Sequence, residues 1–197
     1  MGDPAALGRV VGTAFRRRRD GTLTATLHPG EIDLLASLVG QLLELLADGE
    51  PQATGPTDPL ERVLDLASPD PPSDPVLRRL FPDAYAEESS AADFRRYTER
   101  GLRDVKRRNA LVVLGALERA EPARRESDER RTVRVDHADA EAWMRSLTDL
   151  RLALGTRLGL EQDDDPQWDE GDPRRYVLSV YEWLGWLQDT LVHAVMR

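Results

Sequence analysis

Hydrophobic and polar residues alternate near the start of the chain, and this period predicts a β-hairpin. Leucine and alanine alternate with threonine over residues 22–27, the pattern of a strand with one buried face. Residues 13–19 precede this strand, and the Asp20-Gly21 pair between the two stretches is typical of a two-residue hairpin turn. Because an isolated hairpin is only marginally stable, we expect it to pack on helices or to pair with a further strand.

Farther along the chain, apolar residues recur every three or four positions, which predicts amphipathic helices. The expected helices span about 29–47, 59–67, 76–80, 86–120, 137–158 and 173–195. Residues 132–135 interrupt this series as a short strand. Gly159 is expected to end the helix over 137–158 as a left-handed cap. In the longest helix the expected buried stripe consists of Phe94, Tyr97, Leu102, Val105, Val112 and Ala116.

These elements predict a mainly α fold. We expect a compact helical domain of about six helices with a small N-terminal β-hairpin, to which residues 132–135 can add a third antiparallel strand. The expected organisation is a flexible N-terminus over 1–12 and a single helical domain over 13–197. Within that domain, 68–75 is a proline-rich loop and 161–172 an acidic loop.

Composition narrows this picture mainly by exclusion. The 197 residues carry 36 acidic and 27 basic side chains, for a formal charge of −9, and no cysteine. Disulfides, thiol nucleophiles and cysteine-type zinc sites are therefore excluded. No apolar run approaches the roughly 18 residues of a membrane span, and the first residues lack the pattern of a secretion signal. We expect a soluble, cytoplasmic protein that does not contact a membrane.

No residue pattern indicates catalysis or a bound metal or cofactor. The three histidines, His28, His137 and His193, lie far apart, and no two have the helical spacing of paired metal ligands. The acidic loop lacks the glycine and the closing glutamate of a calcium-binding loop. Neither a nucleophile elbow nor a phosphate-binding glycine loop is present. We expect no enzymatic activity, no cofactor and no metal.

Basic residues are concentrated in two places, in contrast with the overall acidity. The first, here called the hairpin cluster, consists of Arg16, Arg17, Arg18 and Arg19. The second, here called the helix stripe, consists of Arg96, Arg100, Arg103 and Arg107. The spacing of the helix stripe places its members on one helical face, and both clusters could neutralise nucleic-acid phosphates. The alternative for the stripe is ordinary i, i+4 pairing with acidic neighbours, Glu99 with Arg103 and Asp104 with Arg108, on a solvated helix.

Trp168 stands apart from the other tryptophans because it lies in the acidic loop. It either folds back over the core or offers a contact to a basic partner. The second option belongs to an alternative function, that of a non-enzymatic protein-interaction adaptor without a nucleic-acid contact.

Three segments carry a resemblance to a known family. They are residues 79–85 (RLFPDAY), 93–98 (DFRRYT) and, most specifically, 147–158 (LTDLRLALGTRL). On these segments the chain resembles the actinobacterial AosR-like family of oxidative-stress transcriptional regulators, long catalogued as a domain of unknown function. The signature residues of the third segment are Asp149, Arg151, Gly155 and Arg157. We interpret them as structural, with a carboxylate and a guanidinium in a buried ion pair; the other interpretation is a functional surface.

The resemblance implies a transcription-associated stress-response regulator that acts by binding DNA or the transcription machinery. Redox sensing in the regulator branch of the family depends on a cysteine pair, which this sequence lacks. We therefore expect a regulator without a cysteine redox switch. A homodimer is one of the oligomeric states open to a small helical regulator of this kind.

Overall fold

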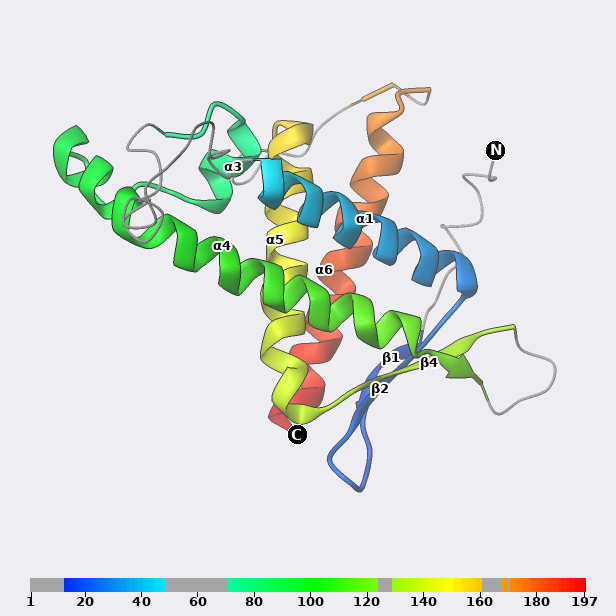
Figure 1. Ribbon diagram of the computed structural model, residues 1–197. Helices are drawn as coiled ribbons and strands as arrows, with labels where there is room; N and C mark the ends of the chain where they lie inside the picture. The colour runs from blue at the N-terminus through cyan, green and yellow to red at the C-terminus, as the bar shows by residue number, and fades with distance from the viewer. Residues whose placement is uncertain (1–12, 49–70, 124–128, 161–167, 170) are drawn as a thin grey trace, which may run out of the picture.

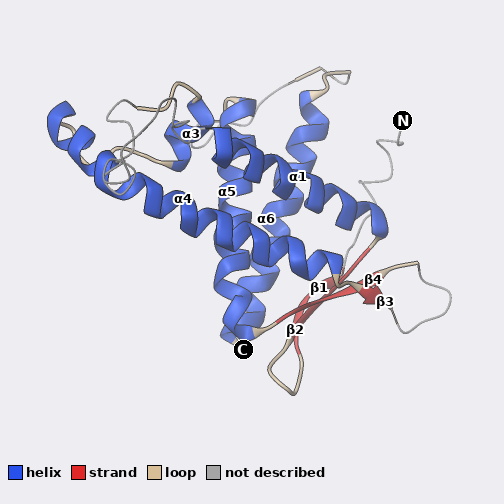
Figure 2. Cartoon of the chain, in the orientation of Figure 1, coloured by secondary structure: helices blue, strands red, loops and turns tan. Residues whose placement is uncertain are grey.

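Two layers of helices cross one another, and a small sheet lies beside one end of them (Figure 1). The computed structural model describes residues 13–48, 71–123, 129–160, 168–169 and 171–197. The N-terminal stretch 1–12, the helix expected over 59–67 and most of the acidic loop lie outside this part of the chain. The described residues form a mainly α fold with a small antiparallel sheet, as the sequence predicts (Figure 2).

The helical layers are two antiparallel pairs. One layer consists of α5 (Ala140–Leu158) and α6 (Arg174–Met196), which lie side by side. The other consists of α1 (Pro29–Asp48) and α4 (Glu88–Glu118), which cross the first layer in Figure 1, with α4 packed on α5. The short helix α3 (Pro75–Leu80) also packs on α5, and Asp74 caps it by accepting two backbone N–H bonds.

The sheet has the strand order β1-β2-β4-β3, and all of its pairs are antiparallel. Its strands are β1 (Thr13–Arg17), β2 (Leu23–Leu27), β3 (Glu121–Pro122) and β4 (Arg131–Val135). The pairing of β2 with β4 confirms the expected third strand, and the short β3 adds a fourth. A 3₁₀ turn, η2 (His137–Asp139), links β4 to α5.

The hairpin turn differs from the expected one. The Gly21 N–H donates to the carbonyl of Arg18 at 3.1 Å, which places Arg19 and Asp20 at the centre of the turn. The Arg18 N–H donates in return to the carbonyl of Thr22 at 2.8 Å. Gly21 follows the central pair with φ of +85°, where glycine avoids the steric penalty of a Cβ atom. The hairpin is confirmed, but a two-residue turn centred on Asp20-Gly21 is wrong.

One face of the sheet is apolar and packs on the helices. Its least exposed side chains are Leu23, Ala25, Leu27, Val133 and Val135. Phe15 on β1 extends this face, and its ring meets Trp143 of α5 edge-on with ring centroids 5.6 Å apart. Because Trp143 is fully buried, this contact joins the sheet to the centre of the helical core.

The buried side of α4 differs from the predicted stripe. Tyr97 is 69% exposed and Leu102 44% exposed, so the prediction is wrong at these two positions. The buried positions of this helix are Ala91, Arg95, Glu99, Arg103, Ala110, Val113, Ala116 and Leu117. Charged side chains occupy the buried face in the first half of the helix, and an apolar pattern cannot detect such a face.

Two helix ends follow from local sequence rules. The Glu31 carboxylate in the first turn of α1 accepts the backbone N–H of His28 at 2.6 Å, which satisfies one donor at the helix start. Gly159 ends α5 with φ of +69°, and its N–H donates to the last turn. The expected left-handed cap at Gly159 is confirmed.

Candidate functional site

The hairpin cluster lies along a groove between β1 and the C-terminal part of α6. The groove has a volume of about 810 Å³ and is lined by all four arginines of the cluster, whose side chains are exposed. From α6 it is lined by Asp189, Thr190, His193 and Ala194, and Arg197, just after this helix, completes the lining. We call this feature the basic groove.

Phe15 fixes the position of β1 beside α6. Its N–H donates to the hydroxyl oxygen of Thr190 at 3.3 Å, and that hydroxyl donates to the carbonyl of Leu187 at 2.9 Å. Its ring is buried against Trp143, as described above. The hydrogen bond from the Phe15 N–H and the buried Phe15 ring therefore hold β1 in place beside α6. The arginines that follow Phe15 in the sequence are exposed to solvent.

The charge of the basic groove is predominantly positive. Five arginine side chains line it, against one carboxylate side chain, that of Asp189. The Asp189 carboxylate lies 3.4 Å from Nδ1 of His193, one turn away on the same helix. Arg18 is oriented by a hydrogen bond from its Nε to the hydroxyl of Thr24 at 3.3 Å. Positive side chains gathered along a groove attract anions, and phosphates spaced along a nucleic-acid backbone are the polyanion that suits such a row.

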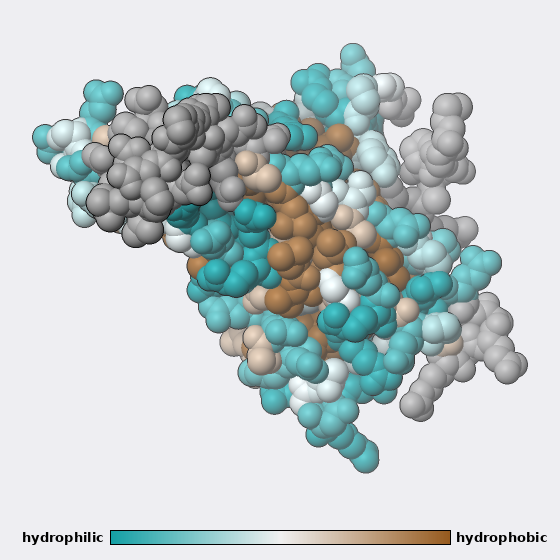
Figure 3. Space-filling view, in the orientation of Figure 1, coloured by the Kyte–Doolittle hydropathy of each residue, from teal (hydrophilic) through white to brown (hydrophobic). Residues whose placement is uncertain are grey.

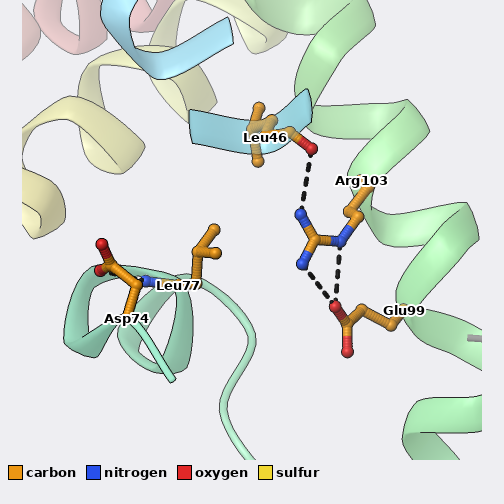
Figure 4. Close-up of polar contacts among 5 residues, drawn as sticks. All are labelled: Leu46, Asp74, Leu77, Glu99 and Arg103. Atoms are coloured by element: carbon orange, nitrogen blue, oxygen red, sulfur yellow. Dashed lines mark hydrogen bonds and ion pairs between the residues drawn. The ribbon is translucent and has the colours of Figure 1, made fainter. Parts of the chain in front are cut away.

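Arg103 of the helix stripe is buried between α1 and α4 (Figure 4). Its Nε and Nη2 atoms donate to Oε1 of Glu99 at 2.9 and 2.6 Å, and its Nη1 atom donates to the carbonyl of Leu46 at 3.0 Å. Its guanidinium carbon also lies 4.7 Å from the centre of the Phe81 ring. A surface role is therefore wrong at Arg103. The i, i+4 pair with Glu99 exists, but it is buried rather than solvated.

The remaining members of the helix stripe do not form a continuous surface with Arg103. Arg100 is exposed and Arg107 is partly buried, and the side chain of Arg96 is outside the described part. Arg95, next to Arg96 in the sequence, is buried and pairs with Asp83. A nucleic-acid role for Arg96, Arg100 and Arg107 stays a prediction.

Asp149 of the signature segment forms a buried ion pair that joins two helices. Its Oδ1 atom accepts a hydrogen bond from Nζ of Lys106 on α4 at 2.6 Å. Burial raises the pKa of Asp149 above its ordinary value, and the hydrogen bond and charge of Lys106 oppose that rise. The partner of the carboxylate is thus a lysine forty-three positions earlier, rather than an arginine of the signature segment.

The other signature residues have different surroundings. Arg151 packs over the ring of Tyr181 on α6, with its guanidinium carbon 4.9 Å from the ring centre. Gly155 is buried, and a Cβ atom there would lie 3.6 Å from the same tyrosine ring. Arg157 is exposed. The structure thus brings Arg151 and Gly155 together at the α5–α6 contact and leaves Arg157 at the surface.

Trp168 is half-buried at the edge of the acidic loop. The guanidinium carbon of Arg174 lies 5.0 Å from its ring centre, and Arg174 also pairs with Asp172.

Among the described residues no group of three or more acidic or histidine side chains is placed to hold a metal ion. In the same part of the chain, no helix combines the length and apolar character needed to cross a membrane.

Sequence reasoning missed a second pocket, which is lined by residues of three helices. Arg79 of α3, Arg151 of α5 and Tyr181 of α6 all line it, and its volume is about 780 Å³. The separate segments RLFPDAY and LTDLRLALGTRL contain its two arginines. Nothing in the spacing of either segment indicated that the two would meet.

Known proteins give a consistent set of relatives. AosR of Mycobacterium leprae is 35% identical over 188 residues, which cover 87% of this chain and 82% of that protein. The oxidative stress regulator AosR of Mycobacterium tuberculosis H37Rv is 31% identical over 195 residues, which cover 90% and 84%. No solved structure shows a significant match to the chain.

The family assignment rests on nearly the whole chain. The model of the family described as a domain of unknown function, DUF2017, matches residues 12–195. This range contains every helix and strand described above except the last residue of α6, and all of the lining of the basic groove except Arg197. The chain therefore belongs to the DUF2017 family, and it is similar over most of its length to the mycobacterial AosR proteins.

Proposed function

We propose that the protein is a stress-response regulator that acts on transcription by binding DNA, and that the basic groove is its DNA-contacting surface. The regulatory part of the proposal is supported by the relatives, which are named as oxidative stress regulators. The DNA-binding part is carried by one observation, the concentration of five arginine side chains along one groove of an acidic protein.

The hairpin cluster suits phosphate contacts for two reasons. Its four side chains are exposed, so they can meet a ligand without unfolding any part of the core. Its backbone is anchored through Phe15, so an arginine at the surface is carried by a fixed strand. Since the chain has a formal charge of −9, we expect binding to be local and to depend strongly on ionic strength.

The absence of cysteine adds a third part to the proposal, namely that DNA binding is not controlled by a thiol switch. Thiol oxidation requires a cysteine, and the chain has none. A response of this protein to oxidants would therefore have to use chemistry other than a thiol switch. We expect DNA binding by the purified protein to be the same before and after treatment with hydrogen peroxide and with reductant.

Fluorescence anisotropy with labelled duplexes tests the proposal. The duplexes are fragments from upstream of the protein's own gene and a scrambled control, measured at salt concentrations from about 50 to 200 mM. We expect selective binding to an upstream fragment, with affinity that falls as salt rises because bound counterions are released from the phosphates. Reversing two charges of the hairpin cluster, Arg16→Glu with Arg17→Glu, should weaken binding by roughly tenfold or more.

A matched variant controls for the change in net charge. Arg108→Glu with Arg157→Glu alters the formal charge by the same amount, and both residues are exposed and outside the lining of the basic groove. Its affinity should stay within about twofold of the wild type. Equal weakening in both double variants, or no selective binding by the wild type, would reject the basic groove as a DNA surface.

A second candidate function, a protein-interaction adaptor, is favoured by an apolar band on the outer helical layer. Figure 3 shows hydrophobic residues gathered between α1 and α4. On α4, Leu111 is 53% exposed, although it is a large aliphatic side chain. If this candidate is correct, Leu111→Glu will abolish retention of a protein partner from a cell extract while leaving duplex affinity unchanged.

A further inference from the structure

The second pocket, between α3, α5 and α6, is basic although the protein is acidic. Its volume of about 780 Å³ is in the range of sites that hold small molecules. Among the described residues that line it are two arginines, Arg79 and Arg151, and no acidic residue. The chain has 36 acidic and 27 basic side chains, so the described lining of this pocket is richer in positive charge than the chain as a whole.

Arg151 is held in place by neutral groups of α6. Its Nη1 atom donates to Oε1 of Gln188 at 3.0 Å, and its Nη2 atom donates to the hydroxyl of Tyr181 at 3.3 Å. Gly185 lies beneath the guanidinium, where a Cβ atom would approach the Arg151 side chain to 3.4 Å. The orientation of this arginine is therefore determined by one face of α6, in the absence of a ligand.

The positive charge of Arg151 is not balanced by a neighbouring carboxylate among the described residues. Its partners there are an amide and a phenol, and its Nε atom is buried without a hydrogen-bond acceptor. The nearest acidic residue in the sequence, Asp149, is paired with Lys106 instead. A half-buried charge with only neutral partners gains more from an anionic ligand than a solvated charge does.

The rest of the lining adds donors and apolar surface. Arg79 is exposed, so its side chain can reach a ligand in the pocket. The Tyr181 hydroxyl accepts from Arg151, which leaves its own hydrogen for donation to a ligand. The carbonyl of Gly155, near the end of α5, is engaged by the N–H of Leu160 at 2.9 Å, so it does not face an anion unpaired. Leu152 and Leu160 provide the apolar part.

We propose that this pocket binds a small organic phosphate. Arg151 and Arg79 contact the phosphate group, which can carry the two negative charges that match two guanidinium groups. The ring of Tyr181 and the two leucines contact the organic part. The pocket shares no lining residue with the basic groove. A ligand bound there could regulate a chain that has no thiol to oxidise.

Titration of the ¹⁵N-labelled protein with phenyl phosphate, followed by amide chemical shifts at low ionic strength, tests the proposal. We expect saturable shifts that map to α5 and α6 around Arg151, with a Kd of about 1 mM or tighter for a ligand of this size. Benzoate, which has the ring but a single charge, should bind roughly tenfold more weakly. Arg79→Gln should weaken phenyl phosphate binding by roughly tenfold, and Arg151→Gln should abolish it.

The variants are chosen so that misfolding cannot mimic the result. Arg79 is exposed and makes no described hydrogen bond or ion pair, so its replacement leaves the fold intact, as the unperturbed amide spectrum would show. Arg157→Gln, on the same helix as Arg151 but outside the pocket lining, is the matched control and should bind within about twofold of the wild type.

Three results would overturn the proposal. One is the absence of saturable shifts up to about 10 mM phenyl phosphate. Another is equal affinity in the Arg79→Gln and Arg157→Gln variants, which would assign the shifts to charge in general. The third is equal affinity for benzoate and phenyl phosphate, which would reject the preference for phosphate. Duplex binding by Arg79→Gln should match the wild type, so this test does not depend on the basic groove.

Discussion

Single residues in this protein show how burial changes the behaviour of a carboxylate. Asp149 and Glu31 are both almost fully buried, and burial raises the pKa of each above its ordinary value. Each carboxylate keeps one strong donor, Lys106 for Asp149 and the His28 N–H for Glu31. Both carboxylates therefore accept a hydrogen bond inside the protein, but each gives up part of the hydration that a surface carboxylate would keep.

The raised pKa of Asp149 predicts a pH-dependent effect of its replacement. Between pH 3.8 and the folded-state pKa, the folded protein binds a proton that the unfolded chain, with its ordinary pKa of 3.8, releases. This contribution to stability is complete below 3.8 and is lost as pH rises through the folded-state pKa. The Asp149→Asn variant lacks it. The wild type should therefore gain stability relative to the variant when urea unfolding is measured at about pH 4 instead of pH 7. A difference that is constant or shrinks toward low pH would contradict the prediction.

Two glycines should respond in opposite directions to the same substitution. Gly159 has φ of +69°, so Gly159→Ala should lower the free energy of unfolding by about 1 kcal/mol. Gly101 lies within α4 with open space around its Cβ position, so Gly101→Ala should raise it by about 1 kcal/mol. Thermal and urea unfolding of both variants provide the measurement. The same sign for both would show that backbone conformation does not decide the effect.

At the scale of elements, the contact between α1 and α4 is partly made by charged groups. Arg103 bridges Glu99 on its own helix and the Leu46 carbonyl near the end of α1. This carbonyl belongs to the last turn of α1, where no further helical N–H is available to it. One side chain thereby satisfies the end of one helix and neutralises a buried carboxylate of another (Figure 4).

Removing Arg103 should therefore lower the free energy of unfolding far more than removing an exposed arginine that also pairs with a glutamate four residues earlier. Arg103→Ala leaves Glu99 buried without its partner, and we expect a loss of about 3–5 kcal/mol. Arg145→Ala removes an exposed i, i+4 pair with Glu141 and should cost about 0.5 kcal/mol or less. Urea unfolding of both variants measures the contrast.

A double variant separates the ion pair from simple packing. Glu99→Gln combined with Arg103→Met removes both charges while keeping similar volumes, so it should be more stable than Arg103→Met alone, which has the same volume at position 103 but leaves the Glu99 carboxylate buried without its partner. A double variant no more stable than the single one would show that the loss comes from packing against Phe81 and the Leu46 carbonyl instead.

At the scale of the whole molecule, the sheet and the helical layers depend on each other. The apolar face of β2 and β4 is buried on the helices, and β1 contacts α6. An isolated two-stranded hairpin would be marginal, so the order of the basic groove derives from the helical core. The surface proposed to contact DNA is thus carried by the same packing that stabilises the protein.

Phe15 is the residue at which this dependence can be tested. Phe15→Ala removes a buried ring from its contact with Trp143 and should lower the free energy of unfolding by about 3–5 kcal/mol. Arg17→Ala, two positions along the same strand, replaces an exposed side chain and should change it by no more than about 0.5 kcal/mol. If Phe15→Ala were as stable as Arg17→Ala, the hairpin would not be coupled to the core. Unfolding followed by tryptophan fluorescence distinguishes these outcomes.

Much of the local structure could be predicted because it depends on neighbours in the sequence. The alternation of Leu23, Ala25 and Leu27 predicted the buried face of β2, and the glycine after Leu158 predicted the end of α5. The two-residue turn was wrong because hydrogen bonding at Arg18 selected a longer loop. The buried face of α4 was missed because Arg95, Glu99 and Arg103 are charged, and hydropathy assigns such residues to the surface.

By itself, then, the sequence determined the helices of the described residues, the hairpin, the third strand and the family, since these depend on periodicity, turn residues and local motifs. Only the tertiary structure decided which charges are exposed. It removed Arg103 from the helix stripe by placing it against Leu46, and it joined Asp149 to Lys106. It also brought Arg79 and Arg151 to one pocket. The physical reason is that the environment of a long charged side chain depends on residues tens of positions away, which meet it only when the helices pack.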